Sequence, residues 1–220
     1  IVVFTGVGGS SNLKTGDMVQ SWVMLEHVDP VTAWQTHEDF AVCGDCNLRH
    51  GASDLRCYVN KGHAPLAVWK AFHRGKYLVV GVDIEFEDAV ERINDAPNRG
   101  GSYGDPLSAP SVFSRLSSVP SYTHQQNNPI IGELIEDGQD PRIHNMASVE
   151  TVYEKRKANQ SGWRTYRIVK ETDSLEDDEI MCPWNPDKPR KVQCVSCKLC
   201  GGAKIHAPNI AVRPLGREHH

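Results

Sequence analysis

The sequence predicts an α/β fold with a mainly parallel sheet, arranged as an open or partial barrel with cysteine-rich metal-binding loops. Strand-like segments alternate with helix-like segments, which is the pattern of folds built from βα units. About five or six such units can be distinguished, fewer than the eight of a closed barrel. A chain of 220 residues with 39% hydrophobic residues fits one globular domain. We therefore expect a single α/β domain over residues 1–220, with a C-terminal cysteine-rich segment at about 180–205.

The first half of the chain contains one predicted strand and three predicted helices. Ser21–Leu25 is apolar and is expected to form a buried strand. A helix is predicted to start at Asp29-Pro30, because proline is favoured at the first helical position. Apolar residues recur at helical spacing in Pro65–Phe72 and again in Glu85–Ile93.

The second half alternates more regularly. Arg99–Pro106 is predicted to be a strand end that runs into a polar loop, and the acidic run Glu171–Glu179 a solvated stretch. The other predicted strands are Ser121–His124, Ile143–Val149, Trp163–Val169 and Asn209–Val212, and the other predicted helices are Val112–Leu116 and Glu150–Lys157. In the strand Trp163–Val169, parity places Arg164 and Arg167 on opposite faces, so at most one of them points into a site.

Charge and composition narrow the class of protein. The net charge of −4 and the lack of a long basic run disfavour a general nucleic-acid-binding surface, although a local patch is compatible with them. No stretch is long and apolar enough to cross a membrane, so no membrane partner is expected. The odd number of 7 cysteines argues against a secreted disulfide framework. The expected compartment is a reducing cytoplasm.

The cysteines fall into two groups that predict metal binding. The first group is Cys43, Cys46 and Cys57, and the second is Cys182, Cys194, Cys197 and Cys200. Cys-x2-Cys spacing lets two thiolates reach one metal centre from a single tight turn. All seven are therefore predicted to be cofactor and metal ligands, for one or two [4Fe–4S] clusters or, alternatively, for zinc.

The second group favours an iron–sulfur cluster. Three cysteines in a Cys-x2-Cys-x2-Cys run wrap one cubane cluster in bacterial ferredoxins, and Cys182-Pro183 supplies a remote fourth ligand. Zinc instead prefers two separated Cys-x2-Cys turns, each giving two ligands. Trp184 follows Cys182-Pro183 and is expected to shield the cluster from water.

The first group supplies only three thiols, as Cys-x2-Cys-x10-Cys. A three-cysteine iron–sulfur cluster would leave one metal position accessible to substrate or water. The alternative is a Cys3His zinc site in which His50 or His63 is the fourth ligand. In the iron–sulfur interpretation, the catalytic residues that we expect to face the accessible metal are His124, Arg99 and Asp105.

These polar residues are chosen for their places along the predicted strands. In a parallel α/β sheet, ligands bind outside the carboxyl ends of the strands, where the loop Arg99–Pro106 is expected to lie. His124 ends a predicted strand and could act as a ligand or a proton carrier. The alternatives are a simple Gly/Asp/Pro turn for the loop and a structural role for the histidine.

Several of these stretches resemble a family of uncharacterised cysteine-rich proteins encoded mainly by phages. The matching stretches are Thr15–Gln20, Cys43–Cys46, Cys57–Val59, Gly104–Pro106, Tyr122–Gln125, Trp163–Thr165 and Cys194–Cys200. The resemblance implies a viral, bacteriophage source and no named activity. A looser similarity is to the partial barrel of radical S-adenosylmethionine enzymes. The first group departs from their Cys-x3-Cys-x2-Cys motif, so binding of S-adenosylmethionine is not carried over.

The sequence therefore predicts an iron–sulfur protein of phage origin with a redox or cluster-based catalytic role. Its expected partners are an electron donor or a small-molecule substrate, and its expected location is the cytoplasm of the host cell. The alternative is a zinc-stabilised module that binds nucleic acid or a host protein. The basic cluster Lys188–Lys191 supports this alternative, whereas the net charge of −4 disfavours it. A metal that only adds folding energy is a third interpretation.

Overall fold

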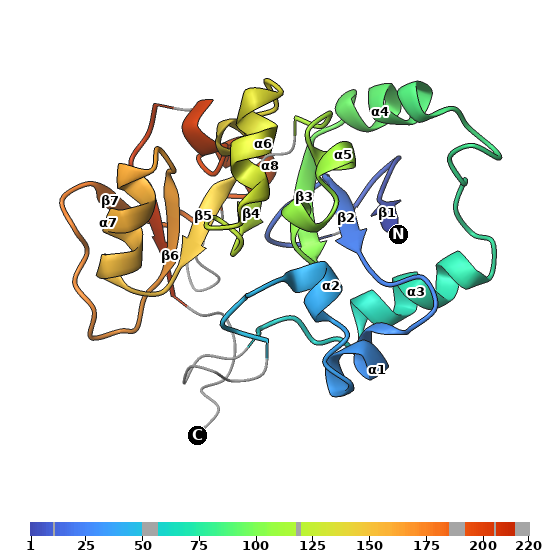
Figure 1. Ribbon diagram of the computed structural model, residues 1–220, viewed down its shortest axis with the longest axis horizontal. Helices are drawn as coiled ribbons and strands as arrows, with labels where there is room; N and C mark the ends of the chain where they lie inside the picture. The colour runs from blue at the N-terminus through green and yellow to red at the C-terminus, as the bar shows by residue number, and fades with distance from the viewer. Residues whose placement is uncertain (11, 50–56, 118–119, 185–191, 205, 214–220) are drawn as a thin grey trace.

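The computed structural model describes residues 1–10, 12–49, 57–117, 120–184, 192–204 and 206–213. Its strands form two sheets that lie beside each other (Figure 1). The three-stranded sheet has the order β1-β2-β3, with β1 (Val2–Thr5), β2 (Val19–Val23) and β3 (Asn98–Tyr103). The five-stranded sheet has the order β4-β5-β6-β8-β7, with β4 (Tyr122–Thr123), β5 (Met146–Val149), β6 (Thr165–Ile168), β7 (Glu179–Met181) and β8 (Asn209–Val212).

Most strand pairs are parallel, as predicted. β1 and β2 are antiparallel, whereas β2 and β3 and all four pairs of the five-stranded sheet are parallel. The two sheets meet where the Gly100 N–H, in β3, donates to the Pro120 carbonyl just before β4, at 3.0 Å. β1 and β7 remain at the two outer edges, so the described strands form an open α/β sheet and not a closed barrel.

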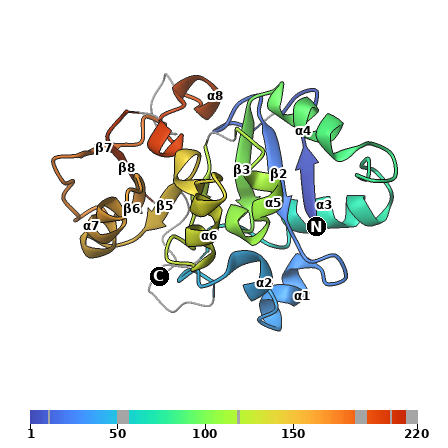
Figure 2. The same cartoon turned by 45° about the horizontal axis from the view of Figure 1, so that its top comes forward.

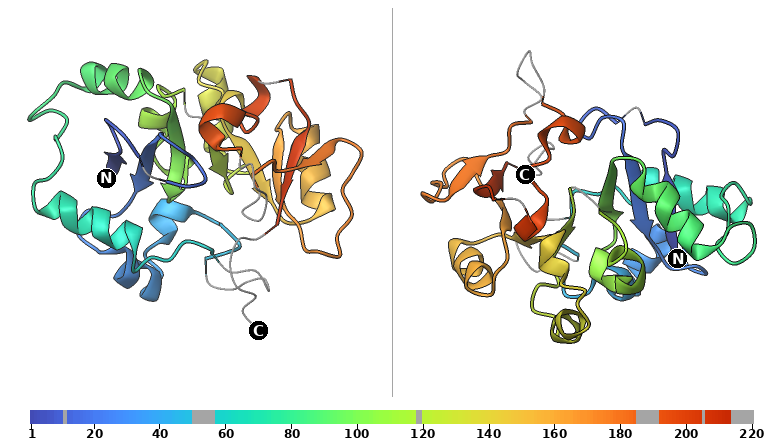
Figure 3. Two further views of the ribbon diagram at one scale, coloured as in Figure 1. Left: turned by 180° about the vertical axis from the view of Figure 1, so that it is seen from behind. Right: turned by 90° about the horizontal axis from the view of Figure 1, so that it is seen from above.

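Four of the helices lie along one side of the sheets. Helices α4 (Phe86–Asn94), α5 (Pro110–Phe113), α6 (Ile130–Glu136) and α7 (Val152–Gln160) lie along that side, and α8 (Cys194–Cys197) lies on the other (Figure 3). Helices α1 (Pro30–Gln35), α2 (Phe40–Cys43) and α3 (Ala64–His73) complete the fold, with short 3-10 turns at Pro106–Ser108, Pro141–Ile143 and Gly202–Lys204.

The core follows the alternation of side chains along the strands. In β5, Ala147 and Val149 are buried and pack against Ala158 of α7 and Trp163. Met146 and Ser148 have the opposite parity and face the other side of the sheet. The apolar core therefore lies between the five-stranded sheet and the helices that cover it. Met146 and Ser148 lie on the other face of the sheet.

Most of the predicted elements are present, with shifted ends. Asp29 caps α1 as expected, because its carboxylate accepts from the Val31 and Thr32 N–H groups. The predicted strand Ile143–Val149 is shorter in the structure. Asp140 caps a 3-10 turn over Pro141–Ile143, which delays the strand until Met146.

The predicted solvated stretch Glu171–Glu179 is wrong at its end. Glu179 begins β7 and is buried, because Arg167 of β6 neutralises it. Arg167 Nε and Nη2 donate to Glu179 Oε1 and Oε2 at 2.8 and 2.7 Å. Arg164, which directly precedes β6, donates to the Leu199 and Gly202 carbonyls instead, so the two arginines point to different sides of the sheet, as predicted.

Candidate metal centre

The four cysteines of the second group lie together. Cys182, Cys194, Cys197 and Cys200 line one pocket, although Cys182 follows β7 and the other three belong to the segment that contains α8. Tyr122 of β4 also lines this pocket and pairs in register with Met146. The pocket therefore lies on the face of the five-stranded sheet opposite α6 and α7.

Backbone hydrogen bonds hold the two cysteine segments in place. The Cys182 N–H donates to the Ala211 carbonyl of β8 at 2.7 Å. The Cys194 N–H donates to the Lys14 carbonyl at 3.0 Å, which fixes α8 against the N-terminal loop (Figure 3). Lys198 ends α8 with a left-handed conformation, φ 55°, and so turns the chain back toward Cys200.

Three cations surround this pocket. Lys14 and Arg99 both favour the charged form of the Cys194 thiol, and Arg164 interacts in the same sense with Cys200. Burial has the larger effect, since it raises the pKa of Cys194 and brings the pKa of Cys200 to about 12. The thiols are half-buried, and cations act on two of them, Cys194 and Cys200.

Two aromatic side chains also offer hydrogen-bond donors to the pocket. The Tyr122 hydroxyl lies within hydrogen-bonding reach of the Cys200 thiol. Trp184 lines the same pocket, as expected for a shielding residue, and Lys14 Nζ lies 5.4 Å from the centre of its ring. The buried Trp184 Nε1–H has no acceptor among the residues that the structure describes. A buried donor without an acceptor is costly, so this N–H suits a pocket that holds an additional acceptor.

The described side chains do not by themselves form a coordination sphere. Within the described ranges, no three His, Cys, Asp or Glu side chains have the arrangement of ligands around one metal ion. The seven cysteines are free thiols. The prediction that all seven are ligands therefore stays a prediction, and the structure contributes the pocket and its surroundings.

The first cysteine group lies near the opposite end of β3 from the second group. Cys43 ends α2, which lies at the arrowhead end of β3, whereas α8 lies at the other end (Figures 1 and 2). The Asp105 N–H donates to the Val42 carbonyl at 2.7 Å, next to Cys43. Gly44 has φ 56°, and a Cβ there would lie 2.5 Å from Gln125 Cδ, so this close approach requires glycine.

The surroundings of the first group are acidic. Burial raises the pKa of Cys43 well above its usual range and that of Cys46 to about 12. The carboxylates of Asp39, Asp105 and Glu150 add to these rises. Such an environment favours neutral thiols over thiolates.

Arg49 and two histidines are the other side chains to consider at the first group. Arg49 is the nearby cation, and its guanidinium is bound to Asp39 at 2.6 Å and to the Gly44 carbonyl at 3.2 Å. His50 lies outside the described residues, and His63 is exposed at the start of α3.

Asp105 and His124 lie beside this first group. Asp105 Oδ1 accepts from the Leu107 N–H at 2.9 Å and from the Thr123 hydroxyl at 2.8 Å, and Oδ2 accepts from the His124 N–H at 2.8 Å. Burial nevertheless raises the pKa of Asp105 to about 6. These contacts give Asp105 a structural role, since they tie the turn after β3 to the end of β4.

His124 itself is held mainly in its neutral form. Burial lowers the pKa of its imidazole to about 4, and the Glu154 carboxylate only partly opposes this effect. The predicted catalytic roles of His124 and Asp105 remain predictions.

Arg99 lies away from these two residues. It is near the start of β3, whereas Asp105 follows the end of that strand. Its charged and titratable neighbours include Tyr58, Tyr122, Tyr166 and Cys194. The three residues expected to face one centre are therefore divided, because Arg99 adjoins the second cysteine group and the other two adjoin the first.

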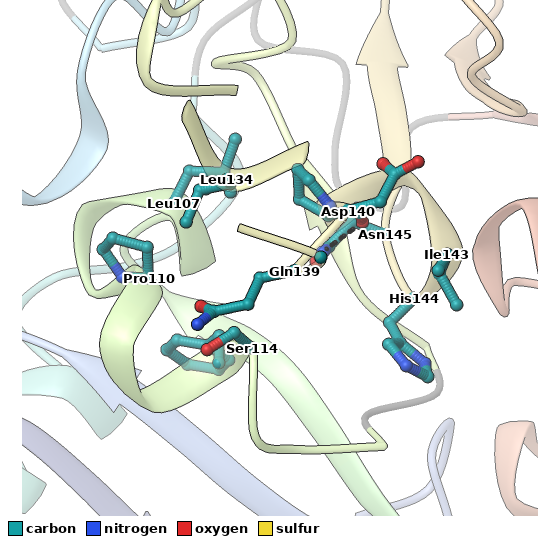
Figure 4. A pocket seen from close by; sticks show the side chains of 12 residues that line it. Leu107, Pro110, Ser114, Leu134, Gln139, Asp140, Ile143, His144 and Asn145 are labelled. Atoms are coloured by element: carbon teal, nitrogen blue, oxygen red, sulfur yellow. Dashed lines mark hydrogen bonds between the residues drawn. The ribbon is translucent and has the colours of Figure 1, made fainter. Parts of the chain in front are cut away.

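A second pocket lies between α5, α6 and the turn Pro141–Ile143 (Figure 4). Leu107, Pro110 and Leu134 form its apolar side, and the polar side chains of Ser114, Gln139 and His144 also line it. The charge of Asp140 in this pocket is already paired, since its carboxylate binds Arg142 at 2.7 Å. Sequence reasoning did not predict this pocket, and it carries no cysteine.

Comparisons with protein-family models, curated proteins and solved structures found no match to the chain. Among the described residues, no helix is long and apolar enough to cross a membrane. The basic cluster Lys188–Lys191, which supported the nucleic-acid alternative, lies outside the described residues.

Proposed function

We propose that the protein binds an iron–sulfur cluster at Cys182, Cys194, Cys197 and Cys200 and has a redox or cluster-based catalytic role. The observation that carries this proposal is the shared pocket, because four cysteines from two separate segments line it. Packing alone gives no reason for four thiols to gather there, whereas four sulfur donors are the ligand set of a cubane cluster.

The charges of the pocket support a centre made of thiolates. Four thiolates around a [4Fe–4S] core carry a net charge of about −2. Lys14, Arg99 and Arg164 place positive charge next to two of the four sulfurs. The Trp184 N–H and the Tyr122 hydroxyl supply donors of the kind that bind cluster or cysteine sulfur and tune its potential.

A bound cluster would supply one-electron chemistry, and the chain's own residues would set its surroundings. Trp184 and Pro183 cover the pocket from the side of Cys182, and Ile210 contributes an apolar wall from β8. These residues would limit access of water to the metal centre. An electron donor or a small-molecule substrate is the partner that this role requires.

The proposal rests on the second cysteine group alone. The first group lies among carboxylates, and its nearby cation Arg49 is already engaged by Asp39. The free state of all seven thiols is compatible with a reducing cytoplasm as the working compartment.

Metal analysis of anaerobically purified protein tests the proposal. We expect a brown protein with about four irons and equal acid-labile sulfide. Cys197→Ser should lose most of the iron and sulfide, because it removes one ligand. Cys57→Ser is the matched control in the first group and should retain both.

Three outcomes would contradict the proposal. Loss of iron in Cys57→Ser and not in Cys197→Ser would move the cluster to the first group. A colourless protein that carries zinc would exclude the redox role and favour a zinc-stabilised binding module. A protein without bound metal after anaerobic purification and cluster reconstitution would exclude a metal centre altogether.

A further inference from the structure

Arg99 is a partly buried arginine beside the second cysteine group. Its Nε is fully buried and makes no hydrogen bond. The guanidinium forms no ion pair or side-chain hydrogen bond with any residue in the described part of the chain. The Nε of Arg164 is also buried without a hydrogen bond, but the other two nitrogens of its guanidinium donate to the Leu199, Gly202 and Pro208 carbonyls.

The groups around Arg99 are phenols and a thiol. The titratable groups that interact most strongly with Arg99 are Tyr58, Tyr122 and Tyr166, followed by Cys194. The rings of Tyr122 and Tyr166 pack in a tilted arrangement, with centroids 4.2 Å apart. Tyr58 is 65% exposed, so this group of side chains adjoins solvent on one side. No carboxylate is among these neighbours.

An arginine in this situation is costly to the folded protein. A buried charge is unfavourable unless it is paired, and each unmade hydrogen bond of a buried donor adds to the cost. The planar guanidinium presents five N–H donors in a fork that matches a carboxylate or a phosphate. An oxyanion would therefore suit Arg99, and the hydroxyls of Tyr58 and Tyr166 can donate to the same group, whereas that of Tyr122 is directed to Cys200.

We propose that Arg99, together with Tyr58 and Tyr166, binds a small molecule through its carboxylate or phosphate group. The site lies beside the second cysteine group, on the face of the sheets opposite α6 and α7. This inference deepens the proposed function, because it gives the substrate of a cluster-dependent reaction an anionic group and a place next to the cluster. The anion site itself needs no metal.

Calorimetric titration of the purified protein with inorganic phosphate and with succinate tests the inference and separates the two anion classes. Wild type should bind one of them saturably at millimolar concentrations. Arg99→Gln should weaken that binding by about tenfold or more, because it removes a charge-assisted hydrogen-bond donor. Arg99→Lys keeps the charge without the fork and should fall between the two.

The matched control is Arg156→Gln, which removes an equal charge from an arginine that is 65% exposed on α7 and paired with Glu176. It should bind the anion as wild type does. Absence of saturable binding to either anion in wild type, or equal affinity in Arg99→Gln and wild type, would overturn the inference. If Arg99→Gln does not fold, Arg99→Lys decides: affinity equal to that of wild type overturns the inference, and weakened affinity supports it.

Iron and sulfide analysis of the same samples keeps this inference separate from the proposed function. Loss of the cluster in Arg99→Gln with unchanged anion binding would make Arg99 a counter-charge to the cluster, and the anion site would be wrong. Anion binding that depends on Arg99 in a protein without iron would support the site and contradict the cluster.

Discussion

The buried ion pair between Arg167 and Glu179 gives a prediction whose magnitude follows from the structure. Both side chains are almost fully buried, at 2% and 0% exposure. Two hydrogen bonds join them, and Arg167 Nη2 also donates to the Ser174 carbonyl at 3.0 Å. Replacing Arg167 by Met would leave the Glu179 carboxylate buried with one remaining hydrogen bond, from the Glu176 N–H at 2.9 Å.

Removing one partner of a buried pair costs about 3–5 kcal/mol, because the other charge stays buried without compensation. The remaining donor to Glu179 reduces this cost, so we expect Arg167→Met to lower the free energy of unfolding by about 3 kcal/mol. Arg156→Met removes the exposed partner of Glu176 and should cost less than about 1 kcal/mol. Both variants also lose one positive charge.

Urea denaturation of the two variants and of wild type, followed by fluorescence and circular dichroism, measures this difference. The double variant Arg167→Met with Glu179→Leu should recover most of the loss, because it removes both charges. The reasoning would be refuted if Arg167→Met and Arg156→Met cost the same. Since Cys182 lies three residues after Glu179, Arg167→Met should also lower the metal content.

Three further predictions concern the two cysteine groups and their neighbours. The pKa of His124 is near 4 when folded and about 6.5 when unfolded, so the unfolded state gains a proton first as the pH falls. Stability should therefore decline by roughly 2 kcal/mol between pH 7 and pH 5, and urea titrations of His124→Gln should lack this part of the slope. Asp105→Asn places an amide against the N–H donors of Leu107 and His124 and should lower the free energy of unfolding by about 2 kcal/mol in the same assay. A decrease of less than about 0.5 kcal/mol would show that these hydrogen bonds do not hold the turn. Removing metal with a chelator should lower the thermal midpoint of wild type but not that of Cys197→Ser, and equal midpoints in wild type before and after chelation would contradict a metal that binds the folded state.

Local signals in the sequence predicted much of the fold. Asp29-Pro30 marks the start of α1 because a capping carboxylate and a proline act on the residues next to them. The alternation in Trp163–Val169 correctly separated Arg164 from Arg167, since parity is a property of any strand. The mainly parallel, open sheet followed from the order of such segments along the chain.

The elements that escaped prediction depend on partners elsewhere in the chain. β7 lies at the end of an acidic run, and its first residue, Glu179, can be buried only because Arg167 neutralises it. The residues close to Glu179 in the sequence do not show that Arg167 pairs with it. The first strand, β1, is only 4 residues long and is stabilised by its antiparallel pairing with β2.

The candidate site also combines features that local sequence predicts with features that depend on distant residues. Cysteine spacing predicts how many sulfurs can reach one centre, but the charges that surround them come from distant parts of the chain. Lys14, Arg99 and Arg164 converge near the second group from three separate segments, whereas Asp39, Asp105 and Glu150 converge near the first.

This difference in charge bears directly on function. Burial raises the thiol pKa in both groups, to about 12 for Cys46 and for Cys200, so the two groups differ in the charged side chains around them and not in burial. The spacing alone predicted a metal at both groups. With the surrounding charges included, the second group is the stronger candidate for a cluster. Arg99 lies beside this group, so the proposed anion site and the proposed cluster are neighbours.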